Sequence, residues 1–202
     1  MRSLGALLAC LAFGLLAGCA VQPALPTAVL DAGAQRTLLA GLQRFSFEGR
    51  VAATSETGGA QATLAWEQQG GESLLRLSGP LGLGATRVRL GAGALSITTS
   101  RGEQLEGDAA LAALGTQVGI QPPLAQLRYW VLGLPAPDSV AEESLDAGGR
   151  LAGLAQQGWT VSFNEYRAQR LPQGQVQLPR RLTASHADLR LRMVIDKWNL
   201  QP

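Results

Sequence analysis

Residues 189–196 read Leu189-Arg190-Leu191-Arg192-Met193-Val194-Ile195-Asp196, with an apolar side chain at every second position. Successive side chains of a β-strand point to opposite faces, so this period of two predicts a strand with one buried and one solvated face. The same period recurs in five other stretches, around Leu64, Leu75, Val88, Ile97 and Val161. Such repetition predicts an antiparallel sheet with a single covered face, because parallel strands are usually buried on both faces.

Turns and three helices are predicted between these strands. Gly70-Gly71 and residues 91–93 are expected to form hairpin turns. The spacing of Leu38, Leu42 and Phe45 predicts a helix from Gln35 to Phe45. Further helices are expected over residues 108–114 and 123–132, each ending before a glycine. We therefore expect a mainly β (α+β) fold, a strongly curved antiparallel sheet with about three helices over its concave side, enclosing either a solid core or a hollow.

The amino terminus has the pattern of a bacterial lipoprotein signal peptide. Arg2 precedes an apolar stretch that ends in the lipobox-like run Leu16-Ala17-Gly18-Cys19. We expect residues 1–18 to be cleaved and Cys19 to be acylated, which would anchor the protein because more than one acyl chain gives stable membrane binding. The alternatives are an ordinary secretory cleavage site near Cys19 or an uncleaved anchor helix.

The remaining chain is expected to form one domain. Residues 19–34 contain proline and glycine without periodicity and are predicted to be a tether, whereas residues 35–202 suffice for a single core. The 17 Lys and Arg residues nearly balance the 15 Asp and Glu residues, without the basic patch expected for nucleic-acid binding. Composition therefore excludes a nucleic-acid partner.

Catalytic and metal chemistry find little support in the residues. Cys10 leaves with the leader and Cys19 carries lipid, so neither a disulfide nor a cysteine ligand is expected. His186 is the only histidine and lies in a predicted hairpin turn. Glu142, Glu143 and Asp146 form a group of carboxylates in a predicted loop, which is typical of a solvated face. We expect no enzyme activity, no metal and no cofactor.

Seven short motifs occur in an order that resembles the LolB family of outer-membrane lipoproteins. They are Phe47-Glu48-Gly49-Arg50, Trp66-Glu67-Gln68, Gly79-Pro80-Leu81-Gly82, residues 127–135 (Leu-Arg-Tyr-Trp-Val-Leu-Gly-Leu-Pro), Gln157-Gly158-Trp159, Leu178-Pro179 and Ile195-Asp196-Lys197-Trp198. The resemblance implies an open, incomplete barrel with a helical lid around an apolar cavity. It also implies a monomer, anchored to the outer membrane and facing the periplasm, that accepts the acyl chains of lipoproteins from the periplasmic carrier LolA and inserts them into that membrane without ATP.

The resemblance also assigns candidate site residues. A loop between two strands of this family projects an apolar residue into the membrane, which puts Leu81 in that role and leaves Leu83 as a second candidate. Alternatively, Leu81 folds back onto the core. The candidate cavity residues are the apolar phase of the strands and lid: Leu64, Trp66, Leu75, Leu77, Val88, Leu90, Leu127, Trp130, Val131, Val161 and Leu191.

These positions could equally belong to a solid core. Periodicity shows which face is buried, but it does not show whether the space under that face is filled. Two alternative functions therefore stay open. One is a structural or assembly-accessory lipoprotein with a solid docking domain, and the other is a lipid-hydrolysing lipoprotein.

Overall fold

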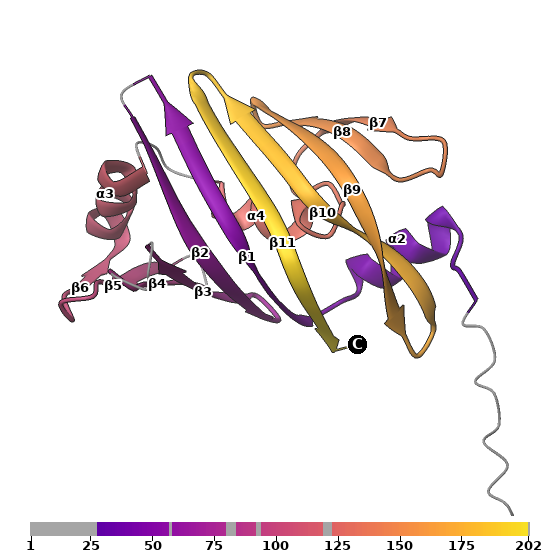
Figure 1. The fold of residues 1–202 in the computed structure, drawn as a ribbon, viewed down its shortest axis with the longest axis horizontal. Helices are drawn as coiled ribbons and strands as arrows, with labels where there is room; N and C mark the ends of the chain where they lie inside the picture. Colours follow the sequence, from indigo (N-terminus) through magenta and orange to yellow (C-terminus); the bar gives the residue numbers. More distant parts are fainter. Residues whose placement is uncertain (1–27, 57, 80–83, 92–93, 119–122, 202) are drawn as a thin grey trace, which may run out of the picture.

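A computed structural model describes residues 28–56, 58–79, 84–91, 94–118 and 123–201. These residues form one eleven-stranded antiparallel sheet and three helices (Figure 1). The strands are β1 (Arg44–Ser55), β2 (Gly58–Gln69), β3 (Glu72–Ser78), β4 (Thr86–Gly91), β5 (Ala94–Thr98), β6 (Gln104–Glu106), β7 (Ala141–Leu145), β8 (Leu151–Gln156), β9 (Trp159–Leu171), β10 (Gly174–His186) and β11 (Leu189–Gln201). The helices are α2 (Ala32–Ala40), α3 (Gly107–Val118) and α4 (Leu124–Trp130). The predicted mainly β, antiparallel fold is confirmed.

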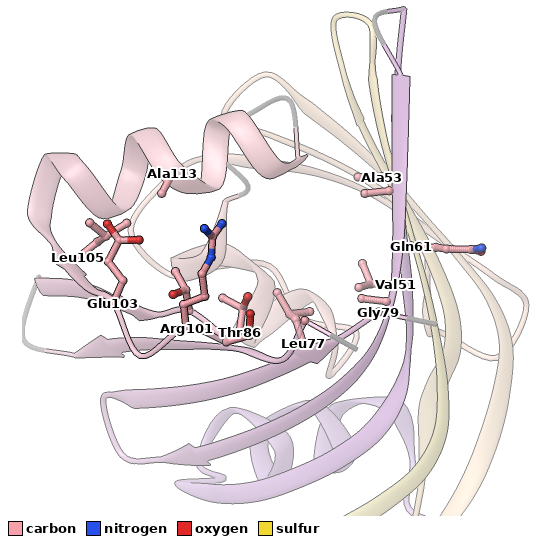
Figure 2. A pocket seen from close by; sticks show the side chains of 15 residues that line it. Val51, Ala53, Gln61, Leu77, Gly79, Thr86, Arg101, Glu103, Leu105 and Ala113 are labelled. Atoms are coloured by element: carbon pink, nitrogen blue, oxygen red, sulfur yellow. The ribbon is translucent and has the colours of Figure 1, made fainter. Parts of the chain in front are cut away.

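The sheet is open, and the first and last strands of the chain lie at its centre. Its order is β6-β5-β4-β3-β2-β1-β11-β10-β9-β8-β7, so the first and last strands pair at the centre while β6 and β7 form the edges. The segment that carries α3 and α4 links these two edges, and the sheet curves around its concave side (Figures 1 and 2). This arrangement confirms the predicted open, incomplete barrel.

A bulge in β11 changes which residues face the core. Glu48 pairs with Lys197 but Gly49 pairs with Ile195, so Asp196 is an extra residue in its strand. The extra residue reverses the alternation, and Trp198 joins the apolar face, with its ring 5.0 Å from that of Phe47. At Gly49 a Cβ atom would lie 2.2 Å from the carbonyl oxygen of Val194, so the bulge admits only glycine there.

Helix α2 is attached to β10 where β10 no longer pairs with β11. These two strands pair only from Arg181↔Val194 to His186↔Leu189, and beyond that β10 pairs with β9 while β11 pairs with β1. The Gln35 side chain joins α2 to this part of β10 by bonding both the N–H and the carbonyl of Gln177, at 2.7 and 3.1 Å. Val29 adds a parallel bridge to Gln175, so residues of the predicted tether are part of the ordered structure.

The predicted helix from Gln35 to Phe45 is wrong in its position. Asp31 caps the helix through a hydrogen bond from Ala34 N, and the helix ends at Ala40. Phe45 instead lies in β1, where Phe45 and Phe47 alternate on the buried face. Phe45 fits a helical spacing with Leu42, but it also alternates with Phe47 at the period of a strand, and the strand forms because it extends the sheet.

Other boundaries also differ from prediction. Helix α3 continues through Gly115 to Val118, beyond the predicted end at residue 114. Glu142 and Glu143 lie in the edge strand β7 and not in a loop; this strand is mostly exposed, so it lacks the apolar alternation that predicts strands. Gly70-Gly71 does form the turn between β2 and β3, whereas residues 92 and 93 of the other predicted turn lie outside the described residues.

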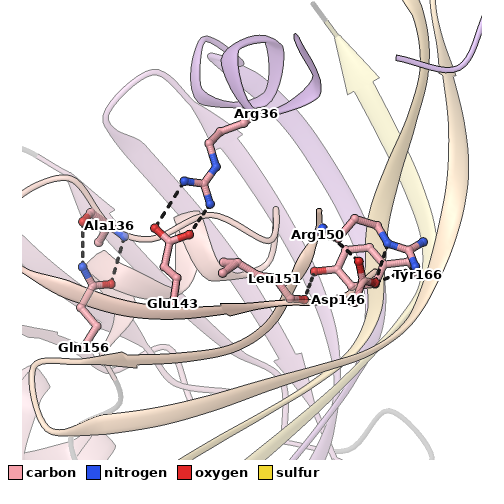
Figure 3. A network of polar contacts seen from close by, with 8 residues as sticks. All are labelled: Arg36, Ala136, Glu143, Asp146, Arg150, Leu151, Gln156 and Tyr166. Atoms are coloured by element: carbon pink, nitrogen blue, oxygen red, sulfur yellow. Dashed lines mark hydrogen bonds and ion pairs between the residues drawn. The ribbon is translucent and has the colours of Figure 1, made fainter. Parts of the chain in front are cut away.

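Two buried glutamines lock the core to its surroundings. Gln156 accepts hydrogen bonds from Trp130 Nε1 (2.9 Å) and Ala136 N (3.0 Å), and it donates to the carbonyls of Ala136 and Ser139. Its contacts to Ala136 are drawn in Figure 3. Gln68 likewise accepts from Trp66 Nε1 (3.2 Å) and from Ser73 Oγ (2.6 Å). Each glutamine thus satisfies a buried indole, which would otherwise lose its hydrogen bond to water.

We expect Gln156→Leu to lower the free energy of unfolding by at least about 2 kcal/mol, because several buried polar groups lose their partners. Urea denaturation followed by circular dichroism measures this loss. Gln69→Leu, at an exposed position of β2, is the matched control and should change stability by less than about 0.5 kcal/mol. Equal stability of the two variants would contradict the role given to Gln156.

Candidate functional site

A pocket of about 520 Å³ opens on the concave side, between α3 and one end of β1 to β4. Figure 2 shows α3 on one side of this space and the strands on the others. Its volume lies within the roughly 300–1,000 Å³ typical of ligand sites. It is lined by Val51, Ala53, Ala60, Gln61, Ala62, Leu77, Gly79, Gly84, Thr86, Thr99, Ser100, Arg101, Glu103, Leu105 and Ala113. Among the labelled residues, the Gln61 side chain points away from the hollow (Figure 2).

The hollow arises because side chains on one face of β1 and β2 become smaller along the strands. At one end Phe47 pairs with Trp66, and their rings stack 5.6 Å apart. Toward the other end the pairs are Val51 with Ala62 and Ala53 with Ala60. The large residues fill the space beneath the sheet, and the small ones leave it open under α3, which packs against β2, β5 and β6.

The structure distributes the predicted cavity residues between pocket and core. Leu77 lines the pocket. Leu90 is half-buried and packs against the core. The other nine are buried in the core: Leu64, Trp66, Leu75, Val88, Leu127, Trp130, Val131, Val161 and Leu191. Contact of any of these residues with an acyl chain stays a prediction.

Sequence reasoning missed most of the pocket wall. Ala53, Ala60 and Ala62 are not among the predicted candidates, because a search for large apolar residues passes over alanine, and Val51 is not among them either. The sequence does contain one indication of the pocket. Where the end of β1 is joined to the start of β2, the alternation continues with alanine in place of large residues.

The predicted insertion loop starts and ends at this pocket. Leu81 and Leu83, like Cys19, lie outside the described residues. Gly79 and Gly84, which border residues 80–83, both line the pocket. Leu77 and Thr86 pair at the base of this connection. The predicted insertion loop is therefore joined through the chain to the pocket rim at both of its ends.

Charged groups elsewhere stabilise the fold. The side chains of Arg36 and Glu143 join α2 to β7, and Asp146 pairs with Arg150 at 2.7 Å (Figure 3). Hydrogen bonding from Arg150 lowers the pKa of Asp146 below its usual value. Burial raises the pKa of Tyr166, whose hydroxyl donates to the carbonyl of Leu151 at 2.6 Å. None of these residues lines the pocket described above.

The described residues contain neither a metal-binding cluster nor a membrane-spanning helix. Within the described ranges no group of three or more His, Cys, Asp and Glu side chains is arranged to hold a metal ion. His186 ends β10 at the hairpin, exposed to solvent, with its ring 5.2 Å from that of Trp159. No helix among the described residues is both long and apolar enough to cross a membrane.

The open antiparallel sheet, with a helix-covered pocket on its concave side, defines a half-barrel class of proteins. A LolA superfamily protein from Nitrosomonas europaea has the same fold, with a TM-score of 0.52 and 8% identity over 86% of this chain and 95% of that chain. A putative outer membrane lipoprotein-sorting protein domain from Vibrio parahaemolyticus gives a TM-score of 0.53 at 7% identity, over 84% and 91% of the two chains. The chain belongs to the family described as outer membrane lipoprotein LolB, whose model matches residues 43–198.

Named relatives agree with this family. The outer-membrane lipoprotein LolB of Pseudomonas paraeruginosa is 36% identical over 160 residues, which cover 79% of this chain and 76% of the relative. The LolB of Chromohalobacter salexigens is 34% identical over 190 residues, or 92% and 86% of the two chains. The family expected from the seven motifs is confirmed.

We predict that Ala62→Phe fills the pocket and reduces the binding of a hydrophobic dye such as bis-ANS several-fold. The assay is a fluorescence titration of residues 19–202 carrying Cys19→Ala. Ala65→Phe, on the same strand but the opposite face, should bind the dye like the parent. Full dye binding by folded Ala62→Phe would mean that the dye binds elsewhere.

Proposed function

We propose that this protein receives the acyl chains of lipoproteins from the periplasmic carrier LolA in the pocket under α3. It then inserts the lipoproteins into the outer membrane. One observation carries the proposal: in a chain of the LolB family, a largely apolar pocket lies at both ends of the connection that holds Leu81 and Leu83. An acyl chain that leaves the pocket along this connection would move directly toward the segment predicted to contact the bilayer.

The energetics of acyl chains require such a host. Each methylene removed from water contributes about 0.8 kcal/mol, so several chains exposed together would cost tens of kcal/mol. Val51, Leu77 and Leu105 offer an apolar wall in place of water. If the pocket binds the chains more tightly than the carrier does, and the bilayer more tightly still, transfer proceeds without ATP. This mechanism needs no catalytic residue, and we propose that the protein is not an enzyme.

Membrane attachment follows from the leader. We propose that residues 1–18 are a cleaved signal peptide and that acylated Cys19 holds the domain, as a monomer, on the periplasmic face of the outer membrane. An extended chain from Cys19 to Ala28 spans up to about 30 Å. The anchor therefore keeps the pocket near the bilayer without fixing its orientation.

Leu81→Glu should leave transfer from the carrier intact and reduce insertion into vesicles at least about tenfold, because a carboxylate is costly in the membrane interior. Flotation of radiolabelled lipoprotein with the vesicles measures insertion, and Leu83→Glu tests the second leucine in the same way. Val140→Glu is the control, because Val140 is 91% exposed and distant in sequence from Leu81. This variant should insert lipoproteins normally. Undiminished insertion by both loop variants would refute the assignment.

Cys19→Ala tests the anchor separately. The unlipidated chain should still move lipoproteins from the carrier to membranes, but it should distribute them between inner- and outer-membrane vesicles with little preference. Density-gradient separation of the two vesicle types measures this distribution. Complete loss of transfer would mean that the lipid at Cys19 does more than tether the domain.

A further inference from the structure

One side of the pocket is polar and carries a guanidinium group. The turn between β5 and β6 holds Arg101 in place: Thr99 N donates to the carbonyl of Glu103 at 2.9 Å, and Gly102 N donates to the carbonyl of Thr99 at 3.0 Å. Gly102 has a φ of +81°, which this closed turn requires. In Figure 2 the Arg101 side chain extends from the turn toward α3, into the space that the pocket occupies.

Among the described residues, neither the guanidinium of Arg101, which is exposed, nor the hydroxyl of Thr99 has a hydrogen-bond acceptor. Six ion pairs within the described ranges engage other arginines, and none involves Arg101, although Glu103 lines the same pocket. The hydroxyl of Thr99, which also lines the pocket, is the buried one, and it has no hydrogen-bond partner in the described part of the chain. A buried polar group without a partner is rare in folded proteins and calls for a ligand or another specific explanation.

The rest of the wall is largely apolar. Val51 and Ala53 from β1, Leu77 from β3 and Ala113 from α3 surround the same space. A ligand that satisfies both sides must therefore combine an apolar chain with a polar head. Since a guanidinium group only donates hydrogen bonds, the part of the head that meets Arg101 must present acceptor oxygens.

We infer that Arg101 and Thr99 bind the ester and amide carbonyl oxygens where the acyl chains of a lipoprotein join its first cysteine. The chains then lie along Val51, Leu77 and Ala113, and the polypeptide of the cargo leaves the pocket at its open side. This inference rests on the proposed function and names the polar part of its ligand. Glyceryl esters also occur in phospholipids, whereas the amide on cysteine occurs only in the lipoprotein.

The test uses the chain of residues 19–202 carrying Cys19→Ala with a dye bound to it. It measures how well each of three probes displaces that dye. The probes are a tripalmitoylated cysteine peptide, a diacyl phosphatidylethanolamine and hexadecyltrimethylammonium, which has an alkyl chain without carbonyls. Arg101→Gln should weaken binding of the peptide about tenfold, because hydrogen bonds to charged groups are the stronger ones. It should leave binding of the ammonium probe unchanged or tighter. Arg89→Gln, at an exposed position on the other face of β4, is the control and should alter neither.

Thr99→Val gives a second, independent readout. Removal of an unpartnered buried hydroxyl should not lower the melting temperature of the free protein, yet it should weaken binding of the tripalmitoylated peptide. A purely structural role for Thr99 predicts the reverse pattern, a lower melting temperature with unchanged affinity.

The outcomes separate the inference from the proposed function. If the parent chain binds the peptide and both variants bind it equally well, the inference is overturned while the proposed function stands. If phosphatidylethanolamine binds with the same affinity and the same dependence on Arg101, recognition of the acylated cysteine is overturned. If the parent chain binds neither acylated probe, both the inference and the proposed function fail.

Discussion

The pairing of β1 with β11 is the interaction on which the rest of the structure depends. It joins β1–β6 and β7–β11, two runs of sequential antiparallel strands, into one sheet with one concave side. The apolar faces of the two runs then form one continuous core. Neither run alone has a second layer of structure to cover its own apolar face. The bulge at Asp196 belongs to this pairing, and only Gly49 lets the two backbones approach there. The motif Phe47-Glu48-Gly49-Arg50 therefore has a structural reason: Phe47 packs, Gly49 fits the bulge, and Arg50 pairs with Asp196 at 3.0 Å.

The same concave surface is solid in one part and hollow in another. Trp66 with Gln68 and Trp130 with Gln156 are two copies of one arrangement, in which a buried indole donates to a buried glutamine. The first pair links β2 to β3 through Ser73, and the second fixes helix α4 against β8. Near α3, alanines on β1 and β2 replace the large side chains, and a pocket results. A pocket thus arises in this fold from side-chain size, with no change of topology.

Much of the fold could be predicted, because alternation reports directly which strand face is buried. The strands around Leu64, Leu75, Val88, Ile97, Val161 and Leu191 are present, and the short motifs led to the correct family. The failures have physical causes. Phe45 fits both a helical spacing with Leu42 and a strand alternation with Phe47, and β7 is too exposed to show a pattern. Among the candidate cavity residues only Leu77 lines the pocket, since the alternation of a packed core and that of a cavity are identical.

The amino-acid order alone determined the local properties of this protein: which strand faces are apolar, where turns occur, and which family the motifs belong to. Each of these depends on residues that are neighbours in the chain. The tertiary structure decided the pocket, because an unfilled volume is the difference between the space that several strands enclose and the side chains that distant residues place there. It also decided that Arg101 lies beside that volume with no carboxylate partner among the described residues, since the absence of a contact depends on every group that folding brings near.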